Sequence, residues 1–188
     1  LTSGSSGLLT SNTTAGTNST WVQSTSTWTS SGLQPNTQYS FTVQSRNGDA
    51  VSGGTSSASK YTLASQPVEG SSVTCDKSKS SAYPNNTVFT FSNPAVFGTG
   101  GANKISYFKY VWNQTATHTF SGDGTTWNSG TLARTGSANG NWYLHLQSYN
   151  AENVATSTTL SYGPFVIDAT APSPPAGLDL AAADDTGD

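Results

Sequence analysis

Charged residues are scarce in this 188-residue chain. They make up only 9% of it, the net charge is −3, and the 7 basic residues are scattered along the sequence. A protein that binds nucleic acid needs clustered lysine and arginine to neutralise phosphates, so this class of function is excluded. Scarce charge with few aromatic residues would indicate disorder, but 5 Trp, 8 Tyr and 7 Phe are enough to build a buried core.

Cysteine is nearly absent as well. The single residue, Cys75, cannot form an internal disulfide, which excludes a disulfide-stapled fold. We expect it to be a small buried residue of a strand at 72–75, with a reactive or dimerising thiol as the alternative. No apolar run approaches the roughly 18 residues of a membrane span, and the first residues lack the features of a signal peptide. The chain is therefore expected to be a piece of a longer protein, without a membrane span in this piece.

Serine and threonine are abundant and together make up about a third of the chain. Threonine suits strands, whereas serine, glycine and asparagine suit turns. Helical periodicity is nearly absent. Alternating polar and apolar residues predict strands at 39–45, 87–92, 104–112, 141–150 and 158–167. The sequence therefore predicts an all-β fold, a sandwich or a barrel.

Two proline-bearing segments, near 64–67 and at 168–175, divide the chain. Prolines make short linkers stiff, which favours a rod of modules over flexibly joined ones. The predicted division is one module at 1–64, a second at 65–171, and a linker with the start of a further module at 172–188.

The run GLQPNTQY at 32–39 resembles the corner in the second half of a fibronectin type III domain. The resemblance implies that Leu33 closes the bottom of a β-sandwich, Pro35 stiffens the turn, and the Tyr39 hydroxyl binds the backbone of the corner. Only residues 1–31 precede it, so this first module is expected to be incomplete. Either the sequence begins inside the module, or another chain supplies the missing strands by strand addition.

Residues 66–172 resemble a bacterial immunoglobulin-like module. The resemblance rests on YFKYVW at 107–112, NWYLHLQSYNAEN at 141–153 and the closing DATAP at 168–172. Modules of this kind are repeated in adhesins and other surface proteins, which implies that the chain is secreted or displayed on a cell surface, with neighbouring modules of the same chain as partners. The low cysteine content fits a bacterial surface protein.

Groups that could carry catalysis are few. The chain has two glutamates, Glu69 and Glu152, and two histidines, His118 and His145. His145 has no metal-binding residue at ligand spacing and is expected as a solvated residue on a sheet face. The glycine-rich segment 98–101 lacks the lysine and helix of a phosphate loop. We therefore expect no enzyme activity and no cofactor other than, at most, calcium.

Acidic residues near the predicted module boundary form one candidate metal site. Calcium binds six to eight oxygen ligands and would stiffen such a boundary, although no EF-hand loop is present. A solvated acidic tail is the alternative. The candidate calcium ligands are Asp168, Asp179, Asp184, Asp185 and Asp188.

Aromatic residues on the predicted strands 104–112 and 141–150 form a candidate ligand site. If these strands pair, Trp142, Leu144 and Leu146 face inward and four residues share the outer face. Flat rings with polar tips suit docking of a sugar or a protein, and ordinary cross-strand pairing is the alternative. The candidate residues are Tyr107, Tyr143, His145 and Tyr149.

Four asparagines lie in N-x-S/T sequences and are candidate glycosylation sites: Asn12, Asn18, Asn85 and Asn113. The function expected from all these features is structural. The modules act as stiff spacers or interaction units of an adhesin, a matrix component or a filament, and copies of the chain pair by strand addition. The alternative is an accessory glycan-binding module of a secreted polysaccharide-degrading enzyme.

Overall fold

The computed structural model describes residues 7–12, 20–22, 32–94 and 96–173. These residues contain twelve β-strands and no helix, which confirms the predicted all-β class. Within this part of the chain there is accordingly no helix that could cross a membrane.

The N-terminal strands form one antiparallel sheet with the order β2-β1-β3-β4. The predicted strand 39–45 lies inside β3. β4, at one edge of this sheet, is exposed along almost its whole length, and among the described strands it pairs with β3 alone. The bounds are β1 Gly7–Asn12, β2 Thr20–Val22, β3 Gln38–Arg46 and β4 Ser52–Tyr61.

The remaining strands form two sheets that pack on each other like a β-sandwich. One has the order β10-β7-β5 and the other the order β6-β12-β11-β8-β9. All pairs are antiparallel except that of β6 with β12. The bounds are β5 Thr74–Cys75, β6 Ala82–Tyr83, β7 Thr87–Ser92, β8 Tyr107–Asn113, β9 Thr125–Trp127, β10 Leu132–Gly136, β11 Gly140–Tyr149 and β12 Ala155–Ile167.

Aromatic rings from both sheets fill the space between them. Phe89 and Phe91 of β7 are fully buried and pack on Phe165 of β12, with ring centroids 5.0 and 5.6 Å apart. Burying one such side chain contributes about 1.5–3 kcal/mol, so these contacts hold the sheets together.

The central strands alternate as the sequence predicts. Leu144 and Leu146 of β11 are fully buried, and Trp142 packs against the same core. Phe108 and Tyr110 of β8 are buried beside them. β8 and β11 pair with each other, which places Tyr107 opposite Tyr149 and Val111 opposite His145.

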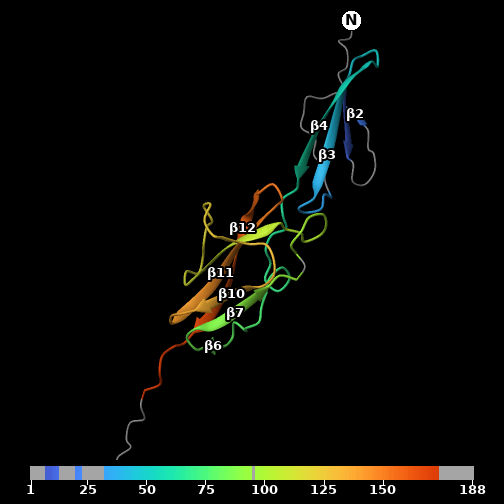
Figure 1. Ribbon diagram of the computed structural model, residues 1–188. Helices are drawn as coiled ribbons and strands as arrows, with labels where there is room; N and C mark the ends of the chain where they lie inside the picture. The colour runs from blue at the N-terminus through green and yellow to red at the C-terminus, as the bar shows by residue number, and fades with distance from the viewer. Residues whose placement is uncertain (1–6, 13–19, 23–31, 95, 174–188) are drawn as a thin grey trace, which may run out of the picture.

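The four-stranded sheet lies beyond one end of the sandwich-like region, whereas β6 lies at its other end (Figure 1). Two segments reach across from the first sheet, the corner 34–37 before β3 and the segment 62–65 after β4. They meet the loop 98–106 and the turn 150–154 of the second region. We call the contact between these four segments the junction.

Candidate functional site at the junction

The corner before β3 is held by the hydrogen bond that the resemblance of residues 32–39 implies. Tyr39 is buried, with 4% of its surface exposed, and its hydroxyl accepts a hydrogen bond from Gln34 N at 2.9 Å. The Thr37 hydroxyl donates to Pro35 O at 2.9 Å and tightens the same turn. Leu33 is half-buried. The corner is therefore a fixed platform for the residue at its tip.

That residue, Asn36, is the centre of the junction. Its backbone has a φ of 43°, a left-handed conformation that asparagine tolerates better than most residues. Its side chain is fully buried, and Nδ2 donates to Gly98 O at 2.6 Å and to Ser106 Oγ at 3.2 Å. Its Oδ1 accepts a hydrogen bond from Ala151 N at 2.8 Å. One side chain thus binds two separate segments of the second region.

The glycine-rich segment 98–101 meets the backbone of the corner. Gly100 N donates to Asn36 O at 3.0 Å, and Gly98 offers its carbonyl oxygen to the Asn36 side chain. Both glycines have a positive φ, 131° for Gly98 and 71° for Gly100, which favours glycine over any residue with a side chain. The glycines noted in the sequence therefore serve this contact.

A second buried asparagine, Asn150, ties the turn after β11 to the segment after β4. Its Oδ1 accepts hydrogen bonds from Glu152 N and Val154 N, which shapes the turn. Its Nδ2 donates to Thr62 O at 3.0 Å. Asn150 is 1% exposed, so all of these bonds form away from water. Buried polar networks in which every group has a hydrogen-bond partner make a contact rigid, and the side-chain amides of Asn36 and Asn150 form such a network at the junction.

Two further bonds lie at the margin of the junction. Ser65 N donates to Lys104 O at 3.2 Å, which anchors the chain as it enters the second region. Lys60 Nζ lies 3.3 Å from Glu152 Oε2. This ion pair is solvent-exposed on the lysine side, and exposed pairs contribute little stability. The buried amides, rather than this ion pair, hold the junction.

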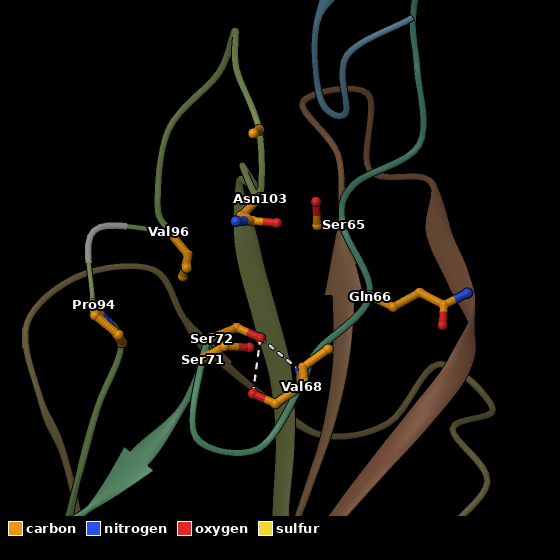
Figure 2. A pocket seen from close by; sticks show the side chains of 9 residues that line it. Ser65, Gln66, Val68, Ser71, Ser72, Pro94, Val96 and Asn103 are labelled. Carbon is orange, nitrogen blue, oxygen red and sulfur yellow. Dashed lines mark hydrogen bonds between the residues drawn. The ribbon is translucent and has the colours of Figure 1, made fainter. Parts of the chain in front are cut away.

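A small cavity lies beside residues 65–68, where the chain enters the second region, and is drawn in Figure 2. Its volume is about 170 Å³, below the usual range of ligand pockets. The Ser72 hydroxyl, which donates to Val68 O at 3.0 Å and accepts from Val68 N at 2.6 Å, closes one side. The lining has no charged residue and consists of Ser65, Gln66, Val68, Ser71, Ser72, Pro94, Val96, Ala102 and Asn103. Its size and neutral lining suit a few water molecules.

The four candidate ligand residues of the outer face do not form one platform. Tyr107 and Tyr149 are stacked on each other, with centroids 4.8 Å apart and an interplanar angle of 10°. Their hydroxyls donate to Asn153 Oδ1 and Gln147 Oε1, both at 3.1 Å. Burial, and then the neighbouring Tyr149, raise the pKa of Tyr107. This pair is tied into the protein through both its rings and its hydroxyls.

The other two candidates, Tyr143 and His145, lie further along β11, and the prediction that His145 is solvated is wrong. His145 is fully buried although it belongs to the outer face of the sheet. Burial lowers its pKa, and the neutral ring donates from Nε2 toward Thr115 O and Asn113 Oδ1, at 3.0 and 3.1 Å. Its Nδ1 accepts from the Ser161 hydroxyl at 2.8 Å.

The segment between β8 and β9 covers this histidine. The ring of His118 lies 5.5 Å from the ring of His145, and Phe120 packs edge-on against His118 at 4.6 Å. His118 Nε2 lies 2.9 Å from Asp123 Oδ2. Ser161, His145 and Asn113 form a hydrogen-bonded series of the kind that can activate a serine nucleophile. Here, however, His145 is enclosed, and Ser161 is its cross-strand neighbour. The arrangement is a buried hydrogen-bond network.

The cysteine is held in a setting that suppresses reactivity. Cys75 is half-buried in β5, and burial raises the pKa of its thiol to about 11. The thiolate is the reactive form, so a reactive role gains no support.

The candidate calcium ligands are placed only in part. Asp168 is exposed, and its Oδ1 accepts a hydrogen bond from Thr170 N at 3.0 Å, as in an ordinary turn. In the described part of the chain, no three His, Cys, Asp or Glu side chains gather into a metal-binding group. Asp179, Asp184, Asp185 and Asp188 lie outside the described residues.

The candidate glycosylation sites differ in setting. Asn85 is exposed in the turn before β7. Asn113 is half-buried, and its Oδ1 accepts from Thr115 N at 2.9 Å beside His145. Asn12 belongs to β1, whereas Asn18 lies outside the described residues.

The residues that matter most at the junction, Asn36 and Asn150, were not predicted as functional. Both stand in turn-forming sequences, and the only available signal was that asparagine is favoured at such turns. Comparison with known families and curated proteins gives no further guide, because no family model and no curated protein matches the chain.

Proposed function

We propose that the chain is a non-catalytic, stiff spacer segment of a secreted or cell-surface protein. Its modules hold neighbouring parts of the same protein at a fixed distance and angle. The observation that carries the proposal is the burial of Asn36 between the four-stranded sheet and the second region. Among the described residues, all hydrogen bonds of its side-chain amide are made to the second region.

The strand orders support a fibronectin type III-like first module at 1–64 and an immunoglobulin-like second module at 65–171. A three-stranded sheet packed on a five-stranded sheet, in which all neighbours except β6 and β12 are antiparallel, fits the immunoglobulin-like architecture. The Tyr39–Gln34 bond supports the fibronectin-like corner.

Self-association by strand addition is part of the same proposal. Among the described strands, β4 lies at an edge of its sheet. It is ten residues long, and Lys60 is its only charged residue. An exposed edge without proline or clustered charge can pair with a second strand. We infer a second copy of the chain as a partner of this edge.

A fluorescence distance measurement tests the spacer proposal. Ser56 in β4 and Ser137 in the turn after β10 are exposed. Each is replaced by cysteine to carry one of the two dyes, and Cys75→Ser removes the native thiol. A stiff spacer gives one narrow distance distribution, which Asn36→Ala broadens. Asn86→Ala is the matched control, because Asn86 has a similar φ of 63° but is exposed, and its backbone nitrogen donates to Gly136 O, outside the junction. A broad distribution in the unsubstituted chain would refute the proposal.

A further inference from the structure

An arginine points into the sandwich-like region from its edge. In β10, Leu132 and Gly136 are buried, and Arg134, halfway between them, shares their inward face. The flanking residues Ala133 and Thr135 are exposed. β10 is the outermost strand of its sheet, so Arg134 sits where the space between the two sheets opens to solvent.

The guanidinium of Arg134 is held in place without a carboxylate. It lies 4.3 Å from the centre of the Tyr110 ring, and Nη1 donates to Ala133 O at 3.0 Å. Burial lowers its pKa. Among the described residues, no carboxylate forms an ion pair with it. A half-buried cation in such a place favours an anionic partner from outside the chain.

An open cleft adjoins this guanidinium. Its volume is about 510 Å³, within the range of ligand sites, and its lining is Tyr110, Val111, Trp112, Gly124, Thr125 and Arg134. β9 pairs with β8 only as far as Tyr110, whereas β8 continues to Asn113. Beyond Tyr110, the described part of β8 therefore has an open edge on this side, next to the cleft.

We propose that this cleft binds an acidic peptide in extended conformation. A glutamate or aspartate carboxylate pairs with the guanidinium of Arg134, which has five N–H donors and gives one to Ala133 O. The peptide backbone lies along the open edge of β8, the mode in which a strand adds to a sheet.

The cleft favours a peptide over an acidic sugar. A sugar ring stacks on an open aromatic face, but Tyr110 is only 7% exposed and the guanidinium already lies over its ring. The site is separate from the junction and adds a binding activity to the proposed spacer.

The test is a titration of the 188-residue chain with a short capped peptide that has one central glutamate among serines and threonines. The comparison peptide carries glutamine in its place, and oligogalacturonate is the third probe. We expect the glutamate peptide to bind at least about tenfold more tightly than the glutamine peptide, and to shift the amide signals of β8 and β10.

Arg134→Gln should abolish this preference, and Arg134→Lys should keep a weakened one. Lys79→Gln is the matched control, because Lys79 also lies over a tyrosine ring, that of Tyr162, but pairs with Glu69. Amide spectra show whether each variant is folded. If Arg134→Gln does not fold, the weakened preference expected of Arg134→Lys still tests the proposal. Equal affinity for both peptides, binding of oligogalacturonate alone, or full preference in Arg134→Gln would overturn the proposal.

Discussion

The side-chain oxygen of Asn36 accepts a hydrogen bond from the backbone nitrogen of Ala151, 115 residues further along the chain, at 2.8 Å. The two residues belong to different β regions, one to the corner before β3 and the other to the turn after β11. Because the same amide also donates to Gly98 O and Ser106 Oγ, the two regions cannot separate without exposing or orphaning several polar groups.

Asn36→Ala should therefore lower the free energy of unfolding by about 2–4 kcal/mol, because it removes all three hydrogen bonds that the fully buried Asn36 amide makes to Gly98 O, Ser106 Oγ and Ala151 N. Urea denaturation followed by tryptophan fluorescence measures the loss. Asn86→Ala carries the same left-handed backbone penalty at an exposed position and should lose only about 1 kcal/mol. Equal losses in the two variants would contradict the role given to the Asn36 amide.

The buried His145 should make stability depend on pH near neutrality. Its pKa is lowered by burial, so the unfolded chain takes up a proton near pH 6.5 while the folded chain resists it. The free energy of unfolding should fall as the pH drops from about 7 through 6.5, and level off below the folded pKa.

His145→Gln should remove this part of the pH dependence, which denaturation curves between about pH 5 and 8 would show. The carboxyl of Asp123 also has a lowered pKa, because Ser121 N donates to it, but its stabilisation is lost only at far lower pH. An unchanged slope in the variant near pH 6.5 would mean that another group is responsible.

Tyr143→Ala and Tyr149→Ala should not change retention of the chain in polysaccharide gels. Tyr149 stacks on Tyr107, and the Tyr143 ring packs so closely against Gly163 that a side chain at position 163 would clash with it. Both tyrosines therefore pack against their own protein. Tyr149→Ala should instead reduce stability by about 1–2 kcal/mol through loss of the stacked pair. Loss of retention in either variant would support the carbohydrate-binding alternative.

The edge of β4 should make the chain associate as its concentration rises, measured as mass by light scattering. Ser56→Lys places a charge in the middle of this edge and should reduce association, because like charges oppose each other in an antiparallel pair. Ser137→Lys, in an exposed turn, is the control. A chain that stays monomeric at every concentration would contradict strand addition. If association were instead lost when calcium is chelated, the result would point to metal binding near Asp168.

The sequence predicted the strands whose alternation is strong, and failed where the structure depends on contacts distant in sequence. β7, β11 and β12 follow clear alternation of aromatic or aliphatic residues with polar ones. β10 was missed because its inward positions hold Leu132, Arg134 and Gly136, of which only the first is hydrophobic. Alternation placed His145 on the correct face of β11, but nothing in it predicts that the segment with His118 folds over that face.

The junction shows the same limit. The resemblance of residues 32–39 to a fibronectin type III corner implied the Tyr39 bond, which joins residues only five positions apart. The partners of Asn36 come from two later segments, and no local pattern indicates them. The outer-face site was predicted by the period of the strands alone, which cannot show that Tyr107 and Tyr149 would stack on each other.

The most direct test of a rigid junction is the alignment of the two β regions in solution. Residual dipolar couplings would be measured for the backbone amides of residues 38–61 and of residues 87–167 in a weakly ordering medium. A rigid junction predicts that one alignment tensor fits both sets in the unsubstituted chain, and that Asn36→Ala requires two. Two different tensors in the unsubstituted chain would show that the regions move independently, which would contradict the spacer account.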